Sequence, residues 1–244
     1  MRLTRVHIPQ PLHEGAEVVL PEGPAAHLTR VLRLAPGDAC IAFNGDGHDY
    51  AATLASVGKR EARLRIGAAV AVDRESPLRL VLLQGVAKGE KMDLILQKAT
   101  ELGVQAIVPV WSQRSDVKLD GERAARRLEH WRGVVASACE QCGRAVVPTV
   151  EAPVPLGGAL QALSDVGLRL LLDPHGPHAM RSLELPGTAA CIAVGPEGGW
   201  SPLDREQLQA AGFSGLRLGP RILRTETAGL AAIAALQARF GDLA

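Results

Sequence analysis

From residue 78 onward, short runs of consecutive apolar residues alternate with longer segments whose apolar residues recur at helical spacing. The runs predicted as strands are residues 78–83, 106–110, 168–172, 190–194 and 216–218. Helices are predicted at residues 92–102, 122–141, 202–211 and 227–240. Because strands that alternate with helices form a mainly parallel sheet covered by the helices, this part of the chain is predicted to be an α/β domain.

The chain before residue 73 has a different pattern, with shorter apolar runs broken by Gly, Pro, Asn and Asp. The segment NGDG at residues 44–47 is a hairpin-type turn signal between two such runs. One helix is predicted at residues 24–33. We therefore predict a small β-barrel domain at residues 1–72 and the α/β domain at residues 73–244, with the polar segment 73–77 as the connection.

Composition excludes some classes of protein and leaves others open. The chain has 244 residues, and we find no apolar run close to the ~20 residues that a membrane helix needs. Its first residues lack the apolar region of a signal peptide, so we expect a cytoplasmic protein without a membrane partner. The net charge of +1 does not by itself indicate a nucleic-acid partner. Cys139 and Cys142 form a single C-x-x-C pair, and we expect no metal site because no second pair accompanies it.

Two loop-like segments follow predicted strands directly. They are GPEGGWS at residues 195–201 and LGPRILRTETA at residues 218–228. Open α/β sheets bind ligands where the carboxyl ends of their strands open into such loops. Neither segment contains G-x-G-x-x-G or G-x-x-x-x-G-K-[ST], which excludes the usual dinucleotide-binding and P-loop interpretations.

These two segments, taken with others along the chain, resemble the ribosomal RNA small subunit methyltransferase E family of the SPOUT superfamily. The further matching segments are RVLR at 30–33, KGEKMD at 88–93, QKATELGV at 97–104, Arg114 with Ser115, and EQCGR at 140–144. They occur in order over nearly the whole chain. The resemblance implies a PUA-like RNA-binding barrel, then a SPOUT methyltransferase domain with a deep trefoil knot.

The activity that the resemblance implies is methylation of N3 of a specific uridine in 16S ribosomal RNA, with S-adenosylmethionine as the methyl donor. The implied substrate is the assembled 30S subunit, and the implied assembly is a homodimer. Glycines suit such a cofactor site because they let the backbone approach the ligand without a Cβ. The expected cofactor-binding residues are Leu172, Gly195, Pro196, Glu197, Gly198, Gly199, Leu218, Gly219, Ile222, Leu223, Thr225, Glu226, Thr227 and Ala228.

Residues for catalysis and RNA binding are expected among the charged residues of the matching segments. Arg224 and Arg5 are candidates to stabilise the uridine anion that forms when N3 loses its proton. Glu226 is a further catalytic candidate, although the favoured interpretation is an ion pair with Arg221 or Arg224 that holds the loop. Glu197 is expected to bind the cofactor or to cap the following helix. The residues expected to bind RNA are Arg5, Arg30, Arg33, Lys88, Arg114 and Arg144.

Two alternatives stay open at this stage. A SPOUT methyltransferase that acts on another RNA, such as a tRNA ribose 2′-hydroxyl, would share the fold, although the LGPRILRTETA segment argues against it. A non-catalytic RNA-binding factor for ribosome assembly would keep the fold without the activity, and the intact loop glycines argue against this. The sequence identifies neither the exact nucleotide nor the general base, and it does not decide whether naked RNA or the assembled subunit is the substrate.

Overall fold

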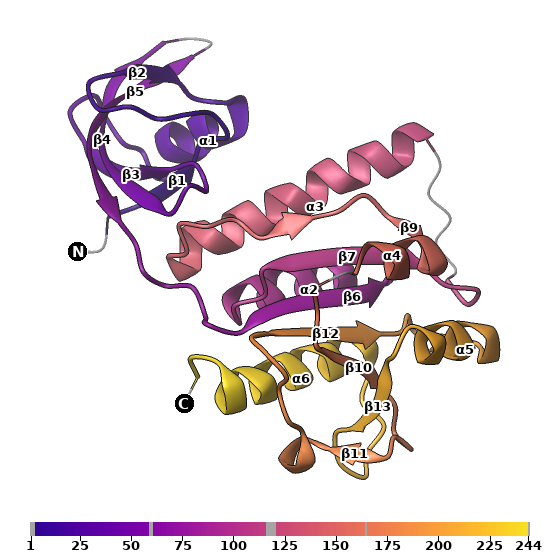
Figure 1. Ribbon diagram of the computed structural model, residues 1–244. Helices are drawn as coiled ribbons and strands as arrows, with labels where there is room; N and C mark the ends of the chain where they lie inside the picture. Colours follow the sequence, from indigo (N-terminus) through magenta and orange to yellow (C-terminus); the bar gives the residue numbers. More distant parts are fainter. Residues whose placement is uncertain (1–2, 59–60, 116–120, 164, 244) are drawn as a thin grey trace. The chain divides into compact units, whose positions relative to one another are not determined.

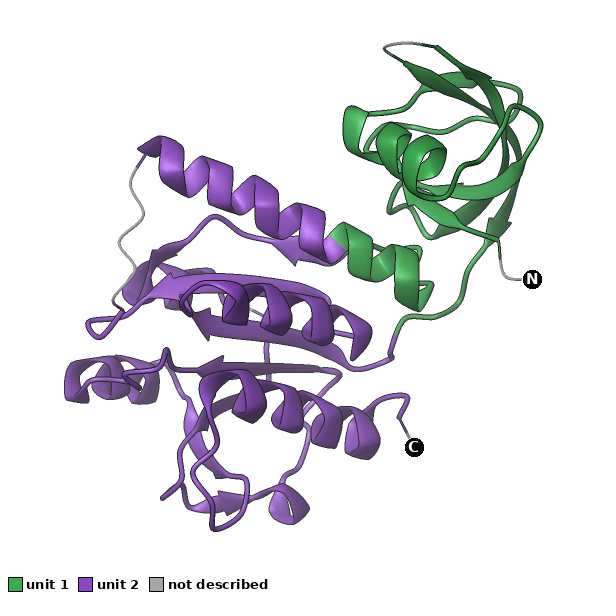
Figure 2. Ribbon diagram, turned by 180° about the vertical axis from the view of Figure 1, so that it is seen from behind, with its two compact units in different colours: residues 1–75, 136–147 green, residues 76–135, 148–244 purple. Residues whose placement is uncertain are grey.

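The computed structural model describes residues 3–58, 61–115, 121–163 and 165–243, and it separates into two compact units (Figure 1). Unit 1 comprises Met1–Glu75 and Ala136–Val147, and unit 2 comprises Ser76–Val135 and Pro148–Ala244 (Figure 2). The long helix α3 (Gly121–Cys142) is thus divided between the two units. The sequence did not indicate that residues 136–147 group with the N-terminal segment, and the division of the chain at residues 72 and 73 stays a prediction.

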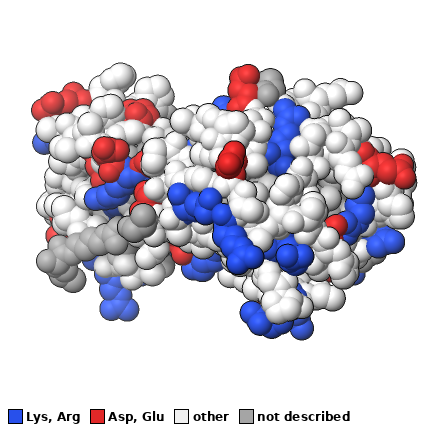
Figure 3. Space-filling view, turned by 60° about the horizontal axis from the view of Figure 1, so that its bottom comes forward, with Lys and Arg blue, Asp and Glu red and all other residues white. Residues whose placement is uncertain are grey.

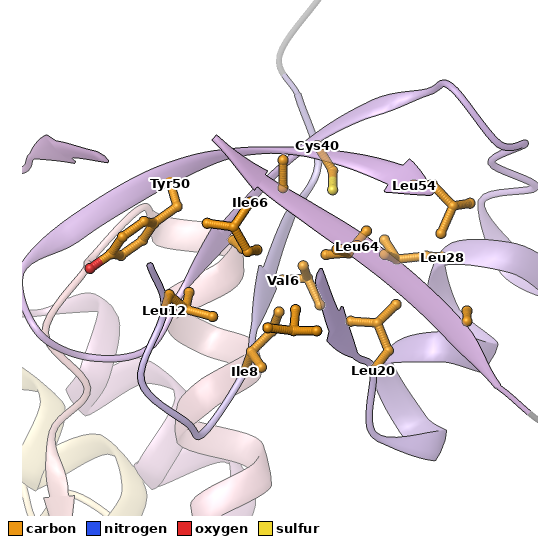
Figure 4. Close-up of a cluster of buried hydrophobic side chains, with 14 residues drawn as sticks. Val6, Ile8, Leu12, Leu20, Leu28, Cys40, Tyr50, Leu54, Leu64 and Ile66 are labelled. Carbon is orange, nitrogen blue, oxygen red and sulfur yellow. The ribbon is translucent and has the colours of Figure 1, made fainter. Parts of the chain in front are cut away.

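Unit 1 is built on a five-stranded sheet with strand order β1-β3-β4-β5-β2. Its strands are β1 (Arg5–His7), β2 (Glu17–Val19), β3 (Ala39–Phe43), β4 (His48–Val57) and β5 (Ala62–Ala71). Alternate residues of β4 and β5 are buried, as in a sheet with one face against a core. Figure 4 shows that core, a cluster of buried side chains that includes Val6, Leu54, Leu64, Ile66 and Leu28.

The helix predicted at residues 24–33 is two shorter elements in the structure. The α-helix α1 (Glu22–Ala26) passes into a π-helical turn, η1 (His27–Val31), in which Leu32 N–H donates to His27 O at 3.0 Å. Arg33 follows with a φ of 58°, in the left-handed region that a non-glycine residue seldom adopts. The chain therefore turns away at Arg33 instead of continuing the helix.

Unit 2 contains a parallel sheet with strand order β11-β13-β10-β12-β6-β7-β8, and β9 pairs with β7. Its strands are β6 (Arg79–Gly85), β7 (Ala106–Trp111), β8 (Thr149–Val150), β9 (Val154–Pro155), β10 (Leu168–Leu172), β11 (His178–Ala179), β12 (Ala189–Val194) and β13 (Ser214–Arg217). Every residue of the central strand β12 is buried, because helices cover both faces of a parallel sheet. The predicted α/β fold with a mainly parallel sheet is confirmed.

The remaining helices of unit 2 are α2 (Glu90–Glu101), α4 (Leu156–Ala162), the 3-10 turn η2 (Met180–Ser182), α5 (Pro202–Ala210) and α6 (Thr225–Phe240). Helices α2 and α6 contact each other, and α6 also contacts β12. Leu156 of α4 and Leu208 of α5 share an apolar cluster with Leu83 and Ala193 of the sheet. The sheet is thus the middle layer of this unit (Figure 1). The trefoil knot stays a prediction from the family resemblance.

Candidate functional site

A pocket lies in unit 2 where strands β10, β12 and β13 end and α6 begins. Because β10 pairs in parallel with both β12 and β13, the loops that follow these strands emerge at one edge of the sheet. The pocket is lined by Leu172, Asp173, Pro174, Val194, Gly195, Gly199, Trp200, Arg205, Leu216, Leu218, Gly219, Arg221, Leu223, Thr225 and Ala228.

Many of the residues expected to bind the cofactor lie in this lining. They are Leu172, Gly195, Gly199, Leu218, Gly219, Leu223, Thr225 and Ala228. The other expected residues, Pro196, Glu197, Gly198, Ile222, Glu226 and Thr227, belong to the same loops but are not part of the lining. Ile222 has 85% of its surface exposed, which places its side chain in solvent in this chain.

Thr225, the first residue of α6, ties the two loops together. Its hydroxyl donates to Gly195 O at 2.5 Å and accepts from the side-chain amide of Gln84 at 3.3 Å. The same amide donates to Gly85 O at 2.9 Å, which fixes its orientation because a carbonyl oxygen can only accept. Gln84 is fully buried at the end of β6, so one network joins the ends of β6 and β12 to the start of α6.

Gly85 allows the loop after β12 to pass close to the end of β6. A Cβ added at Gly85 would lie 2.5 Å from Pro196 Cδ and 2.6 Å from Pro196 N. Gly195 is constrained in a similar way, because an added Cβ would lie 3.2 Å from backbone atoms of Gly199 and Trp200. These contacts hold the loop in a tight curve, with Gly199 itself at a φ of 66°.

Asp173 and Arg205 form an ion pair in the pocket lining, with Arg205 donating from one Nη to Asp173 at 2.5 Å. Asp173 also accepts from the backbone N–H of His175. Partial burial alone would raise the pKa of Asp173, but the hydrogen bonds from His175 and Arg205 outweigh it and lower this pKa below its usual range. The pocket lining therefore contains a negatively charged carboxylate, Asp173, paired with a positively charged guanidinium group, Arg205.

Arg205 is a lining residue to which the sequence analysis gave no role, whereas Trp200 belongs to the GPEGGWS segment that it singled out. The signal that could have placed Arg205 is the S-P-x-D pattern at residues 201–204, since Ser201 and Asp204 form a capping box that starts α5. Arg205 then stands in the first turn of α5, directly after the loop. Trp200 is 4% exposed and ends the GPEGGW segment.

Arg224 and Glu226 occupy the start of α6. Arg224 is exposed at the N-cap, and its backbone carbonyl accepts from Ala228 N–H at 2.7 Å. Glu226 is in the first turn, and its Oε2 is a buried oxygen without a hydrogen-bond partner among the described residues. This oxygen therefore does not take part in the ion pair with Arg221 or Arg224 that was expected for Glu226.

Arg5 and Arg144, which were expected to act in catalysis and RNA binding, are both buried in unit 1. Both are about 5% exposed or less. Arg5 donates to Cys139 O at 2.6 Å, to Asp49 and to Arg144 O, and its guanidinium lies 4.3 Å from the Phe43 ring centre. Arg144 pairs with Glu75. Both guanidinium groups are thus bound within unit 1 in this structure, and the roles expected for them in catalysis and RNA binding stay predictions.

The other residues expected to bind RNA are at the surface. Arg30 and Arg33 are exposed in unit 1, and Lys88 and Arg114 are exposed in unit 2. Within the described ranges, no group of three His, Cys, Asp or Glu side chains is arranged to hold a metal ion. Of the helices in the same ranges, none is long and apolar enough to cross a membrane.

Comparisons with known proteins identify both parts of the chain. A family model described as "RNA methyltransferase domain" matches residues 74–237, and one described as "RNA methyltransferase PUA domain" matches residues 25–67. The chain is 32% identical to ribosomal RNA small subunit methyltransferase E of Buchnera aphidicola subsp. Schizaphis graminum, with 99% of this chain and 98% of the relative covered. It is 33% identical to the protein of that name from Bacillus subtilis, with 86% and 85% covered.

Comparison with solved structures leads to the same family. The ribosomal RNA small subunit methyltransferase E from Neisseria gonorrhoeae, bound to S-adenosyl methionine, matches with 40% identity and a TM-score of 0.93 over 100% of both chains. A putative methyltransferase from Legionella pneumophila in complex with the bound cofactor SAM matches with 36% identity and a TM-score of 0.95, again over 100% of both chains. With the pocket at the strand ends and a match along both parts of the chain, this protein belongs to the ribosomal RNA small subunit methyltransferase E family.

Proposed function

We propose that the protein methylates N3 of a specific uridine in 16S ribosomal RNA, with S-adenosylmethionine as methyl donor and the assembled small subunit as substrate. The observation that carries this proposal is the pocket, whose lining comes from both the GPEGG and the LGPRILRTETA segments. Relatives over nearly the whole chain are named for the small-subunit RNA. A cytoplasmic location is consistent with a ribosomal substrate, and it stays a prediction.

The residues of the pocket fit S-adenosylmethionine. Leu216, Leu218 and Leu223 line it with apolar groups that suit adenine. The close backbone approach at Gly195 leaves carbonyl and N–H groups without a Cβ beside them. Asp173 and Arg205 supply charges of both signs, which match the amino and carboxylate groups of the methionine part. The cofactor, when bound, supplies a methyl group that the sulfonium has already activated.

The protein must position the uracil and remove the proton from N3. Arg224 follows pocket-lining Leu223 and is exposed, so we assign it to the uracil oxygens, where it stabilises the developing negative charge. Glu226 Oε2 is buried and accepts no hydrogen bond from the described residues. We assign this oxygen to accept the proton that leaves N3. Because N3 is inaccessible in stacked, paired RNA, the target uridine must be unpaired or turned out of the stack.

RNA contacts are assigned to Arg30, Arg33, Lys88 and Arg114, all of which are exposed. Because the net charge of the chain is only +1, RNA binding depends on local groups of positive side chains. Figure 3 shows one face of the molecule on which Lys and Arg form several local groups. Binding through such groups weakens with salt, because each phosphate contact releases counterions.

The proposed assembly is a homodimer. The apolar side of α6 is not evidence for a dimer interface, because Ile233 and Leu236 on it are fully buried within the single chain. Ile222 and Leu203, at 85% and 45% exposure near the pocket loops, are better candidates for a surface that a second copy covers. Light scattering on the purified protein should give twice the mass of the chain, and a monomer mass would contradict the proposal.

The test of the function is methyl transfer from labelled S-adenosylmethionine to small ribosomal subunits that lack the modification, followed by nucleoside analysis. Label in 3-methyluridine is the expected result. Label in a ribose-methylated nucleoside would contradict the assignment of N3. Binding of S-adenosylmethionine without transfer to the subunits would indicate another RNA substrate, and absence of both would favour the non-catalytic alternative.

A further inference from the structure

Residues of the segments that follow two neighbouring strands contact the loop at residues 195–199, with Lys88 and Lys91 after β6 and Arg114 after β7. Lys91 Nζ donates to Glu197 Oε1 at 3.1 Å, and so does the backbone N–H of Lys88. Arg114 donates from one Nη to Gly198 O at 3.2 Å. Strands β12, β6 and β7 are adjacent and parallel, so the segments that follow them meet at one edge of the sheet.

The Glu197 carboxylate contacts the Lys91 ammonium group and the backbone N–H of Lys88. It is exposed and absent from the pocket lining. Partial burial alone would raise its pKa, but hydrogen bonds from backbone N–H groups and from Lys91 outweigh it and lower the pKa. Glu197 is therefore ionised at neutral pH, and its carboxylate occupies a position suited to an anion.

The contacts around Glu197 can exchange for contacts with another anion. An exposed ion pair contributes little net free energy, so the Lys91–Glu197 pair is readily broken. The Arg114 guanidinium has five N–H donors, and its contact with Gly198 needs one of them. A phosphate oxygen accepts from both side-chain types with shorter and stronger hydrogen bonds than a neutral carbonyl does.

We propose that Lys91 and Arg114 bind a phosphate of the RNA backbone beside the cofactor pocket, and that Glu197 takes the place of this phosphate in the free protein. The inference rests on the proposed function, since it presumes an RNA substrate. Glu197 and Gly198 belong to the loop that curves around the pocket, so RNA that displaces Glu197 acts on the same loop as the cofactor. Glu197 then regulates access of RNA and does not bind the cofactor.

The experiment compares Glu197→Gln, Lys91→Gln and the control Glu101→Gln. Glu101 is an ion-paired carboxylate of the same helix as Lys91, with 26% of its side chain exposed against 25% for Glu197. Filter binding to undermethylated small subunits is measured at several salt concentrations, and S-adenosylmethionine binding is measured by calorimetry. Methyl transfer by the wild-type protein is measured on the same subunits.

Glu197→Gln is expected to tighten RNA binding about two- to fivefold, the effect of one exposed ion pair, with unchanged affinity for S-adenosylmethionine. Lys91→Gln should weaken RNA binding and reduce the slope of log affinity against log salt by about one unit. Glu101→Gln should change neither. Loss of cofactor affinity in Glu197→Gln would overturn this inference. Unchanged RNA binding in both Glu197→Gln and Lys91→Gln would also overturn it, but would leave the proposed function in place if the wild type transfers methyl groups. Absence of methyl transfer by the wild type would instead count against the proposed function.

Discussion

At the scale of single residues, Arg224 carries the strongest prediction about chemistry. Arg224→Ala should lower kcat by about 10²- to 10³-fold, the usual effect of removing one group that stabilises an oxyanion. Its stability should change by no more than about 0.5 kcal/mol, because the side chain is exposed. Arg217→Ala, which removes another exposed arginine from β13, is the control and should keep full activity. A fully active Arg224→Ala would refute the assigned role.

Thr225 is predicted to act through position alone. Thr225→Val removes the hydroxyl that joins Gln84 to Gly195 O, at a cost of about 1–3 kcal/mol. Gly195 O loses this donor, and the buried amide of Gln84 keeps only its hydrogen bond to Gly85 O. The affinity for S-adenosylmethionine should fall, because the two pocket loops lose their connection. Thr225→Ser keeps the hydroxyl and should restore the affinity. Calorimetry decides, and full affinity in Thr225→Val with loss in Thr225→Ser would show that the methyl group matters instead of the hydroxyl.

At the scale of elements, the approach of the residue 195–199 loop to the end of β6 can be tested through Gly85. Gly85→Ala forces a Cβ to within 2.5 Å of Pro196, so the loop must move. Cofactor affinity should fall by more than tenfold, a cost of about 1.4 kcal/mol or more. Gly133→Ala is the matched control, because a Cβ at this exposed position of α3 meets no atom within 4 Å. It should raise helix stability by up to about 1 kcal/mol.

The loop that joins β10 to β11 should show a dependence on pH. The pKa of Asp173 is lowered in the folded protein, so its contacts stabilise the fold above the unfolded pKa of about 3.9. This contribution is lost as the pH falls through the lower folded pKa. Asp173→Asn should therefore be less stable than the wild type at pH 6, and the difference should shrink toward pH 3. Urea unfolding at both pH values measures it, and a constant difference would contradict the argument.

At the scale of the whole molecule, the division into units predicts the result of truncation. A chain that begins at Ser76 lacks the partners of residues 136–147, because Arg5 donates to Cys139 O, Arg74 to Gly143 O and Gly47 N–H to Ala145 O. Each lost hydrogen bond costs about 1 kcal/mol. The truncated chain should therefore unfold at lower urea concentration than unit 2 does in the full chain. Equal midpoints in fluorescence-monitored unfolding would contradict this expectation.

The sequence by itself determined the fold class, the loops of the site and the family. Apolar runs that alternate with helical spacing suffice to predict a parallel sheet, since burial on both faces leaves a local pattern. The glycines and threonines of residues 195–199 and 218–228 were recognisable because loop conformation and close backbone approach depend on residue type.

Only the tertiary structure decided what each charged side chain does. Arg5 and Arg114 were both expected to bind RNA. Arg5 is buried beside Asp49 and Cys139, whereas Arg114 is exposed beside Gly198. Arg205 enters the pocket through the packing of α5, and residues 136–147 join unit 1 across a long separation in sequence. A charge is bound internally or presented to a ligand according to neighbours that are distant along the chain, and the local pattern does not contain those neighbours.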